Sequence, residues 1–285
     1  MTHISQRLGI SITRLGEYLR RFGAAGAWLS LEHQVKFRLS RRTAPRSTMI
    51  PGLGRVLFRP RSSDLATFRE IFVNRDYDLE AHGILDLART RYGAICRRGG
   101  SPLILDLGAN IGLATLQFKQ FFPEADVIAV EPGKDNIELA RRNLEGQLNI
   151  RFVHAAIWDK ETIVQLTDGC DQSSRHVRTG EEAGVESVPA ITVEKIVGGR
   201  EADLFLVKID VEGAEARIFG KDDVSKGWLS GVPAIIIEGH DGSHNRHGSL
   251  SGLLQHENYR NGRITSAGPA LVLVPIEWFG DVGAR

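Results

Sequence analysis

The stretch LILDLGANIGLAT (residues 103–115) sets the expected fold, because a short apolar run ends in an acid and then in closely spaced glycines. A buried strand, a glycine turn and a helix start are what an open α/β sheet places at its ligand-binding edge. The glycines are Gly108 and Gly112, and Asp106 precedes them. Their spacing differs from the G-x-G-x-x-G of dinucleotide sites, where a carboxylate would repel the pyrophosphate. Asp106 instead suits an ammonium or a sulfonium ligand.

Strands and helices are expected to alternate from this stretch onward. The apolar patterns predict strands at 127–130, 150–153, 203–210 and 234–238, helices at 113–121, 134–144 and 213–219, and a hairpin at 163–167 and 188–193. This alternation indicates βαβ units and a parallel, doubly wound α/β sheet. Near the end, apolar runs at 259–264 and 271–276 are separated by a turn too short for a parallel crossover. They predict a C-terminal antiparallel hairpin.

The first hundred residues precede this alternation and divide into two parts. Residues 1–48 predict a basic helical N-terminal extension, and residues 49–100 predict a strand and helices that pack on the core. The strand is expected at 55–59 and the helices at 65–73 and 80–92, with Asp64 capping the first helix. Residues 101–285 then form the main domain.

The charge of the N-terminal extension is strongly positive. Up to residue 61 the only acids are Glu17 and Glu32, among many arginines, and apolar residues recur at roughly helical spacing. One interpretation is a basic amphipathic helix that makes a peripheral contact with an anionic membrane, a lipid-linked substrate or a partner. The other is a helix packed on the main domain with arginines facing water. Gly16, Gly23 and Gly26 weaken an autonomous helix and favour the second.

The bulk composition is that of an ordinary globular protein, with 42% hydrophobic and 25% charged residues. Lys+Arg 36 against Asp+Glu 35 leaves a net charge near zero, which argues against a mainly electrostatic nucleic-acid partner. Two cysteines support neither a disulfide framework nor a cysteine zinc site, and they fit a reducing cytoplasm. No apolar run approaches the roughly 18 residues of a membrane span. We therefore expect a cytoplasmic protein.

A second part of the ligand site is expected at the end of the next strand, in VIAVEP (127–132). Glu131 lies where an acid can bond ribose hydroxyls. Gly108 lets the backbone approach a ligand, and Asn110 can hydrogen-bond within the turn or to the ligand. The motif D-x-G-x-N-x-G, ending at Gly112, with a strand-ending acid predicts an S-adenosylmethionine site. For the adenine, backbone groups at Ala155 and Ala156 are one interpretation, and a plain sheet edge is the other.

The stretch LFLVKIDVEG (204–213) predicts a buried strand that carries ionisable groups at Lys208, Asp210 and Glu212. Side chains alternate along a strand, so these three are expected on one face. The following strand, in AIIIEGHD (234–241), ends in Glu238, with His240 just beyond. Because buried charges are costly unless they are paired or used, we expect this cluster to lie beside the donor site.

Three interpretations of the cluster remain open. In the first, Lys208 neutralises neighbouring carboxylates and the set only positions loops. In the second, His240 is the general base for a hydroxyl acceptor, and Asp210, Glu212 or Glu238 orients it. In the third, Asp210 and Glu238 bind Mg²⁺ through their oxygens. The three histidines of 240–247 favour a mobile substrate loop over a metal cluster.

Together these stretches resemble the FkbM-type methyltransferase family. The matching pieces are FRPRSSDLATFREIFVNRDY (58–77), LILDLGANIGLAT, AVEP, LVKIDVEGAE (206–215) and IIIEGH (235–240). The resemblance implies a class I methyltransferase, Rossmann-like fold and S-adenosylmethionine as the donor. It also implies which positions contact the donor and which line the acceptor side: Asp106, Gly108, Asn110 and Glu131 for the donor, and Lys208, Asp210, Glu212, Glu238 and His240 for the acceptor.

The resemblance further implies an O-methyltransferase. Its acceptor would be a hydroxyl on a sugar, a polysaccharide precursor or a secondary metabolite, either as a small molecule or as a lipid-linked glycan. Two alternatives stay open: a methyltransferase acting on a nitrogen of a macromolecule, and a non-catalytic binding protein that retains the fold. The first commonly shows an N/D-P-P-Y/F motif after the fourth strand, where this chain has IDVEG.

Overall fold

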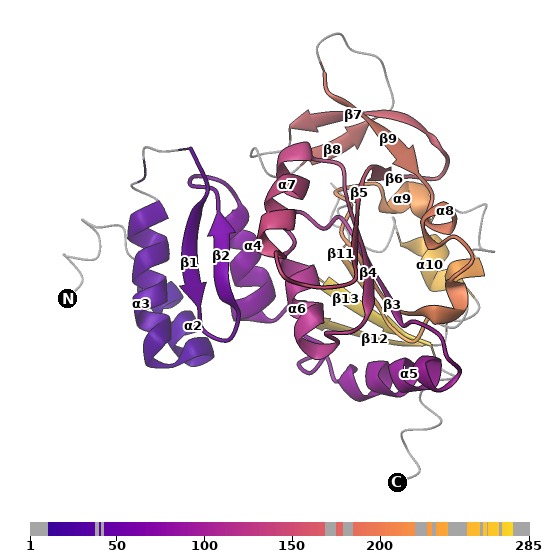
Figure 1. Cartoon of the computed structure of the whole chain (residues 1–285), viewed down its shortest axis with the longest axis horizontal. Coiled ribbons are helices and arrows are strands. Elements are labelled where there is room, and N and C mark those ends of the chain that lie inside the picture. The colour runs from indigo at the N-terminus through magenta and orange to yellow at the C-terminus, as the bar shows by residue number, and fades with distance from the viewer. Residues whose placement is uncertain are drawn as a thin grey trace.

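The computed structural model describes a seven-stranded α/β body with a smaller N-terminal unit packed on one side (Figure 1). The described residues are 11–37, 40, 43–168, 175–178, 185–219, 227–229, 232–238, 250–256, 259–260, 262–267 and 270–275. Within these ranges, no helix combines the length and the apolar character that crossing a bilayer would require.

The N-terminal unit comprises the described residues up to 74, and one further helix follows it before the main sheet. The elements of this part of the chain are mostly short. They are α2 (Ile12–Phe22), α3 (Ala24–Glu32), η1 (His33–Phe37), β1 (Arg46–Ile50), β2 (Gly54–Phe58), α4 (Asp64–Phe68), η2 (Arg69–Asn74) and α5 (Leu85–Arg97). The strands β1 and β2 form an antiparallel hairpin, of which the sequence predicts only the second strand.

The main sheet confirms the predicted architecture. Its strands are β3 (Leu103–Leu107), β4 (Asp126–Glu131), β5 (Ile150–His154), β10 (Leu204–Ile209), β11 (Ile235–Glu238), β12 (Arg263–Ala267) and β13 (Ala270–Val274). Their order is β12-β13-β11-β10-β3-β4-β5. The pairs from β5 to β11 are parallel, whereas β13 runs antiparallel to both β11 and β12. The sheet is therefore mostly parallel and ends in the expected antiparallel hairpin.

Helices cover both faces of this sheet, as a doubly wound fold requires (Figure 1). On one face, α5, α6 (Leu113–Phe121) and α7 (Lys134–Asn143) share a hydrophobic cluster with the N-terminal unit. On the other face, α8 (Val193–Val197), α9 (Glu215–Ile218) and α10 (Ser251–Gln255) share a second cluster. Two short turns, η3 (Glu201–Asp203) and η4 (Gly227–Leu229), complete the described helical elements.

A second, four-stranded sheet lies beyond β5. Its strands are β6 (Ala156–Ile157), β7 (Thr162–Asp168), β8 (Arg175–Arg178) and β9 (Ser187–Ile191), in the order β6-β9-β7-β8. The antiparallel pairing of β7 with β9 confirms the hairpin predicted at 163–167 and 188–193. Leu103–Leu107, by contrast, is buried throughout at the centre of the main sheet, which places its carboxyl end inside the molecule.

Two predicted helices differ from the structure for local reasons. The helix expected from residue 80 begins at Leu85, because the Asp78 carboxylate accepts hydrogen bonds from the Glu80 and Ala81 amides and holds a turn there. The helix expected over 65–73 starts at Asp64 and becomes the π-helical η2 after Phe68. Asp64 does not cap it, since its carboxylate binds Arg59 instead.

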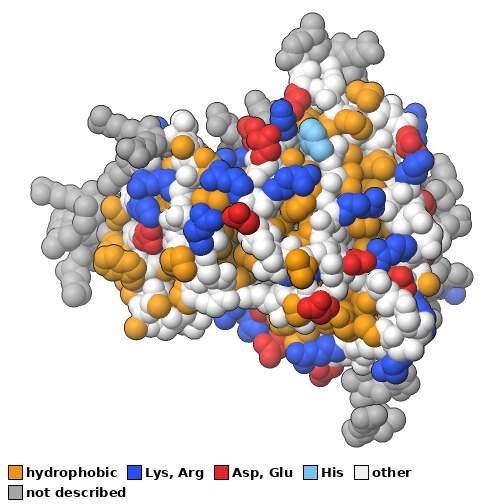
Figure 2. Space-filling model, in the orientation of Figure 1, with side chains coloured by type: hydrophobic (Ala, Val, Ile, Leu, Met, Phe, Trp, Pro, Cys, Tyr) orange, Lys and Arg blue, Asp and Glu red, His pale blue; other side chains and the backbone are white. Residues whose placement is uncertain are grey.

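The helical pattern of the N-terminal unit is confirmed, but its apolar face is largely exposed. Tyr18 and Leu29 are buried, whereas Ile12, Leu19 and Trp28 are exposed, Trp28 to 73%. In Figure 2, hydrophobic side chains gather at the outer end of this unit, over α2 and α3. The unit therefore packs on the body through fewer apolar residues than the periodicity predicts.

Candidate active site

The strand order creates one edge where ligands are expected. The chain leaves β3 toward β4 and β5, then returns to β10 on the other side of β3 and continues to β11. The carboxyl ends of β3 and β10 therefore flank the switch point of the sheet. The register pairs Asp106 with Lys208 across these two strands, which brings the predicted donor and acceptor motifs together.

Asp106 is fully buried at the end of β3, with one oxygen hydrogen-bonded and the other in an ion pair only. The Thr115 hydroxyl donates to Asp106 Oδ2 at 2.6 Å, and Lys208 Nζ lies 3.5 Å from Asp106 Oδ1. Thr115 belongs to α6, so the carboxylate joins β3, β10 and the helix that follows the glycine turn. Asp106 supports the turn from below and does not line the adjacent cavity.

The two glycines of the turn have different surroundings. Gly108 has a φ of 82°, and a Cβ there would lie 1.7 Å from the Asp210 carbonyl oxygen. Any larger residue would therefore separate the turn from the end of β10. Gly112 has a φ of 83°, and a Cβ there would meet Leu144 and Ala140. Gly112 thus allows α6 to pack against α7, while Gly108 lies at the cavity.

Glu131 ends β4 and reaches the same turn. Its Oε2 accepts a hydrogen bond from the Asn110 amide at 2.9 Å. Its Oε1 accepts from the Gly133 amide at 2.8 Å and from Asn136 Nδ2 at 3.0 Å. Burial raises the pKa of Glu131 even though these three donors lower it. The carboxylate is therefore fixed in orientation before any ligand arrives.

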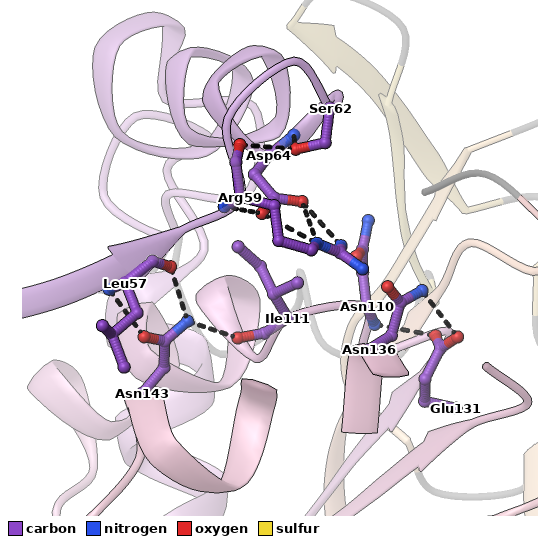
Figure 3. Close-up of polar contacts among 9 residues, drawn as sticks. All are labelled: Leu57, Arg59, Ser62, Asp64, Asn110, Ile111, Glu131, Asn136 and Asn143. Atoms are coloured by element: carbon purple, nitrogen blue, oxygen red, sulfur yellow. Dashed lines mark hydrogen bonds and ion pairs between the residues drawn. The ribbon is translucent and has the colours of Figure 1, made fainter. Parts of the chain in front are cut away.

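The end of β2 is fastened to the back of this turn (Figure 3). Asn143 Oδ1 accepts from the Leu57 amide at 2.8 Å, and Asn143 Nδ2 donates to the carbonyls of Leu57 at 3.3 Å and of Ile111 at 2.9 Å. Two residues further on, the Arg59 guanidinium extends toward the turn and is bound by the buried Asp64 carboxylate (Figure 3). The N-terminal unit therefore helps to position the turn.

A cavity opens above the turn, and most of the residues predicted for the donor line it. Its lining comprises Gly108, Asn110, Val130, Glu131, Pro132, Asn136, Ala155, Ala156, Ile157, Asp210, Val211 and Glu212. Asn110 Oδ1 is buried and has no hydrogen-bond partner among the described residues. An acceptor amide, a fixed carboxylate and apolar walls at Val130 and Ile157 fit a nucleoside with ribose hydroxyls and an apolar base face. The residues present therefore fit S-adenosylmethionine.

Lys208 is the centre of the acceptor side. Its Nζ donates to the Gly108 carbonyl at 2.6 Å and lies 3.3 Å from Asp210 Oδ2. The ammonium also lies over the Tyr77 ring, 5.4 Å from its centroid. Burial lowers the pKa of Lys208, but the carboxylates of Asp210 and Asp106 outweigh burial, so the net pKa is raised. Lys208 is therefore a buried cation that links the acceptor acids to the donor turn.

Tyr77 joins the two acids predicted at neighbouring strand ends. Its hydroxyl lies 3.1 Å from Glu238 Oε2 and 3.3 Å from Asp210 Oδ2, so its proton is shared between two carboxylates. Burial raises the pKa of Tyr77 well above its ordinary value, and both acids add to the effect. Sequence reasoning assigned no role to Tyr77. Its position at the end of the family-like stretch 58–77 was the signal that could have identified it.

Asp76, beside Tyr77, is a second acid that sequence reasoning missed. Its side chain is buried, and Oδ2 has no hydrogen-bond partner among the described residues. Burial, with the negative charge of Glu238 adding to it, raises the pKa of Asp76 to about 6. The His82 ring bonds the Asp76 carbonyl at 2.7 Å, which fixes the backbone. Asp76 therefore extends the acidic cluster toward the N-terminal side.

The structure places Glu212 differently from the prediction and does not describe His240. The strand β10 ends at Ile209, so the alternation expected to align Glu212 with Lys208 and Asp210 stops before it. Glu212 instead sits in a turn, with a φ of 52°, and reaches the cavity from there. His240 lies outside the described residues. Among the side chains that the structure describes, no three histidines, cysteines or acids group together as a metal site. A Mg²⁺ ion stays a prediction.

The strand order, with its antiparallel β13, and the acid-flanked glycine turn below the cavity define a class I, Rossmann-like methyltransferase fold. The comparison with known families agrees. Residues 106–260 match the methyltransferase FkbM domain, and the chain belongs to that family. It therefore carries a methyltransferase domain, and the family implies S-adenosylmethionine as the methyl donor of that domain.

Individual proteins resemble this chain only at low sequence identity or over a short stretch. Methyltransferase sdnD of Sordaria araneosa is 32% identical over 77 residues, which is 27% of this chain and 24% of that protein. The match thus spans about a quarter of the relative. Among solved structures, the bifunctional kinase-methyltransferase WbdD is 17% identical with a TM-score of 0.39, covering 73% of this chain and 41% of that one. A methyltransferase from Geobacter sulfurreducens is 15% identical with a TM-score of 0.37, covering 73% and 87%.

Proposed function

We propose that the methyl acceptor is a hydroxyl group on a sugar, a polysaccharide precursor or a secondary metabolite. The observation that carries the proposal is the pair of carboxylates, Asp210 and Glu238, that share the Tyr77 hydroxyl proton beside the donor turn. A hydroxyl must lose its proton as the new bond to carbon forms, and a carboxylate at this place can accept it. A neutral amine acceptor needs no such base before the methyl group moves.

The chain divides the work among its residues. S-adenosylmethionine supplies, when bound, a methyl group on a positively charged sulfur. Glu131 and Asn110 would hold the nucleoside, because one is a fixed acceptor of ribose hydroxyls and the other has an unused acceptor oxygen. Asp210 lines the same cavity and would orient the acceptor hydroxyl toward the donor. Lys208 fixes Asp210 relative to the donor turn through the Gly108 carbonyl.

Asp210 is the general base in this proposal. Lys208 cannot fill that role, because its raised pKa keeps it protonated. Tyr77 cannot fill it either, because its pKa is raised well above its ordinary value. Asp210 is the acid that lies both at the cavity and within reach of Tyr77. Tyr77 is then a positioning residue that holds Asp210 and Glu238 in one orientation.

The test measures donor binding and methyl transfer separately. Binding is followed by isothermal titration with S-adenosylhomocysteine, and transfer is followed with radiolabelled donor on panels of free sugars, lipid-linked glycans, phenols and amines. Asp210→Asn should lower turnover of a hydroxyl substrate by about 10²–10⁴-fold, while the affinity for S-adenosylhomocysteine changes little. Tyr77→Phe should lower turnover less and shift its pH profile, because the shared proton is lost.

Tyr92→Phe is the matched control. The Tyr92 ring stacks on Phe122 at 5.3 Å, away from the cavity, so turnover should not change. Transfer to amines but not to hydroxyls would overturn the proposal. Strong donor binding with no transfer to any panel would favour a binding protein that retains the fold. Undiminished turnover in Asp210→Asn, with a large loss in His240→Ala, would return the role of general base to His240.

A further inference from the structure

A second cavity lies within the N-terminal unit. It is open to solvent and is lined by residues of α2, the end of α3, η1, the loop at residues 61–62, α4 and the first turn of η2. Its volume of about 470 Å³ falls within the size range of small-molecule sites. None of its described lining residues belongs to the donor cavity. Methyl transfer as described above therefore makes no use of it.

Three arginines from separate elements line this cavity: Arg14 from α2, Arg61 from the loop before α4, and Arg69 from η2. Arg69 Nη2 bonds Glu17 Oε2 at 3.1 Å, while its Nε is buried without a hydrogen-bond partner among the described residues. Among the residues that the structure describes, neither Arg14 nor Arg61 has an acidic partner in an ion pair. Figure 2 shows basic side chains gathered over this unit. The three arginines that line the cavity thus carry more positive charge than Glu17 neutralises.

His33 adds a buried polar group to the wall. Its side chain is only 4% exposed, and its Nε2 has no hydrogen-bond partner among the described residues. Burial, assisted by the nearby Lys36, lowers the pKa of His33 to about 3, so the ring is neutral. Its Nδ1 lies 3.1 Å from the Tyr18 hydroxyl, which can donate to it. That tautomer leaves the proton on Nε2, a buried donor without a hydrogen-bond partner among the described residues.

The remaining wall is apolar and one backbone position is strained. Phe37 and Leu65 supply apolar surface beside the arginines. Arg61 has a φ of 62°, a left-handed conformation that side-chain-bearing residues adopt at a cost. Such positions persist where the surroundings hold them, and they are common at ligand sites. The cavity therefore combines a cationic end, a buried donor and an apolar wall.

We propose that this cavity binds an organic phosphate. Its phosphoryl group would lie among Arg14, Arg61 and Arg69, and its apolar part would lie against Phe37 and Leu65. A dianionic phosphate matches two arginines without acidic partners and a third that is only partly neutralised, whereas a single carboxylate would leave more charge uncompensated. The ligand could be a soluble phosphomonoester or the phosphate headgroup of a lipid. The proposal is independent of the methyl acceptor.

The experiment uses the full chain and 1-naphthyl phosphate as the probe, with 1-naphthol as the uncharged comparison. Isothermal titration should show binding of the phosphate and much weaker binding of the naphthol. Arg14→Ala and Arg61→Gly should each weaken phosphate binding by about tenfold or more. Glycine at position 61 accepts the left-handed backbone, so the second variant removes the side chain without added strain. Unchanged titration with S-adenosylhomocysteine would show that both variants fold.

Arg20→Ala is the matched control, because Arg20 is exposed on the same helix as Arg14 and does not line the cavity. Co-sedimentation with phosphatidylcholine vesicles, with and without phosphatidic acid, provides the lipid arm. Binding to phosphatidic acid that Arg14→Ala and Arg61→Gly abolish, without binding of the soluble probe, would identify a lipid as the source. The proposal is overturned if neither probe binds, if naphthol binds as tightly as its phosphate, or if Arg20→Ala weakens binding as much as Arg14→Ala.

Discussion

Replacing Lys208 by methionine tests whether the buried charges at the switch point depend on one cation. Lys208 Nζ lies 3.5 Å from Asp106 and 3.3 Å from Asp210, and both the lysine side chain and that of Asp106 are almost completely shielded from solvent. Methionine keeps an unbranched apolar side chain as far as Cε but removes the ammonium group. Removing one partner of a buried ion pair costs about 3–5 kcal/mol, because the other charge is left uncompensated.

The loss should depend on pH in a defined direction. In the wild-type protein the carboxylates of Asp210 and Asp106 raise the pKa of Lys208, although burial lowers it. A lysine whose pKa is raised on folding stabilises the folded protein below its unfolded pKa, and this contribution is lost as pH rises through the folded pKa. The difference in the free energy of unfolding between wild type and Lys208→Met should therefore be constant from about pH 6 to pH 9 and decrease only above about pH 10.

Urea unfolding at several pH values measures this difference. Lys119→Met is the matched control, because Lys119 is also buried but donates to the carbonyls of Pro123 and Ala125 at 2.6 and 2.8 Å. No carboxylate of the described residues lies at hydrogen-bond distance from it, so Lys119→Met should cost less stability than Lys208→Met. A loss in Lys208→Met no larger than that in Lys119→Met, or a loss below about 1 kcal/mol at pH 7, would refute the reasoning.

Three further predictions concern neighbouring residues. Gly108→Ala should abolish S-adenosylhomocysteine binding in titration while cooperative unfolding persists, because its Cβ would meet the Asp210 carbonyl at 1.7 Å. Asn143→Ala should lower the free energy of unfolding by about 2–3 kcal/mol in urea, since it removes the bonds that fasten β2 to the turn. Asp76→Asn should raise that free energy by about 2 kcal/mol at pH 8 and leave it unchanged below about pH 4, because the raised pKa of Asp76, about 6, makes its ionised form unfavourable in the folded protein.

The body of the fold was predictable because its signals are local. Each buried strand is a short apolar run, and the turn after β3 carries an acid and two glycines within a few residues. The observed bounds of β3, β4, β10 and β11 agree with the prediction to within a few residues. The π-helical η2 was not predictable in this way, because it depends on packing against α2 and α6 and has no periodic signature of its own.

The residues of the donor side could also be predicted from the sequence, whereas only some residues of the acceptor side could. Lys208, Asp210 and Glu238 stand out as charges in apolar runs. Tyr77 does not, because a tyrosine among other residues carries no such contrast. It lies 133 residues from Asp210 and 161 from Glu238 in the chain, and only the folded structure brings them together.

The buried charges of LFLVKIDVEG (204–213) follow from the position of β10 beside β3. Asp106 is required where β3 ends, because it holds Thr115 and the helix after the turn, and β10 must then supply a cation in register. That cation, Lys208, is compensated in turn by Asp210 at the cavity. Each charge is therefore placed by the previous one, and the last of the three, the partly exposed Asp210, is the one that lines the cavity. The position of Asp210 on the acceptor side thus depends, through Lys208, on Asp106, the charge that stabilises the donor turn.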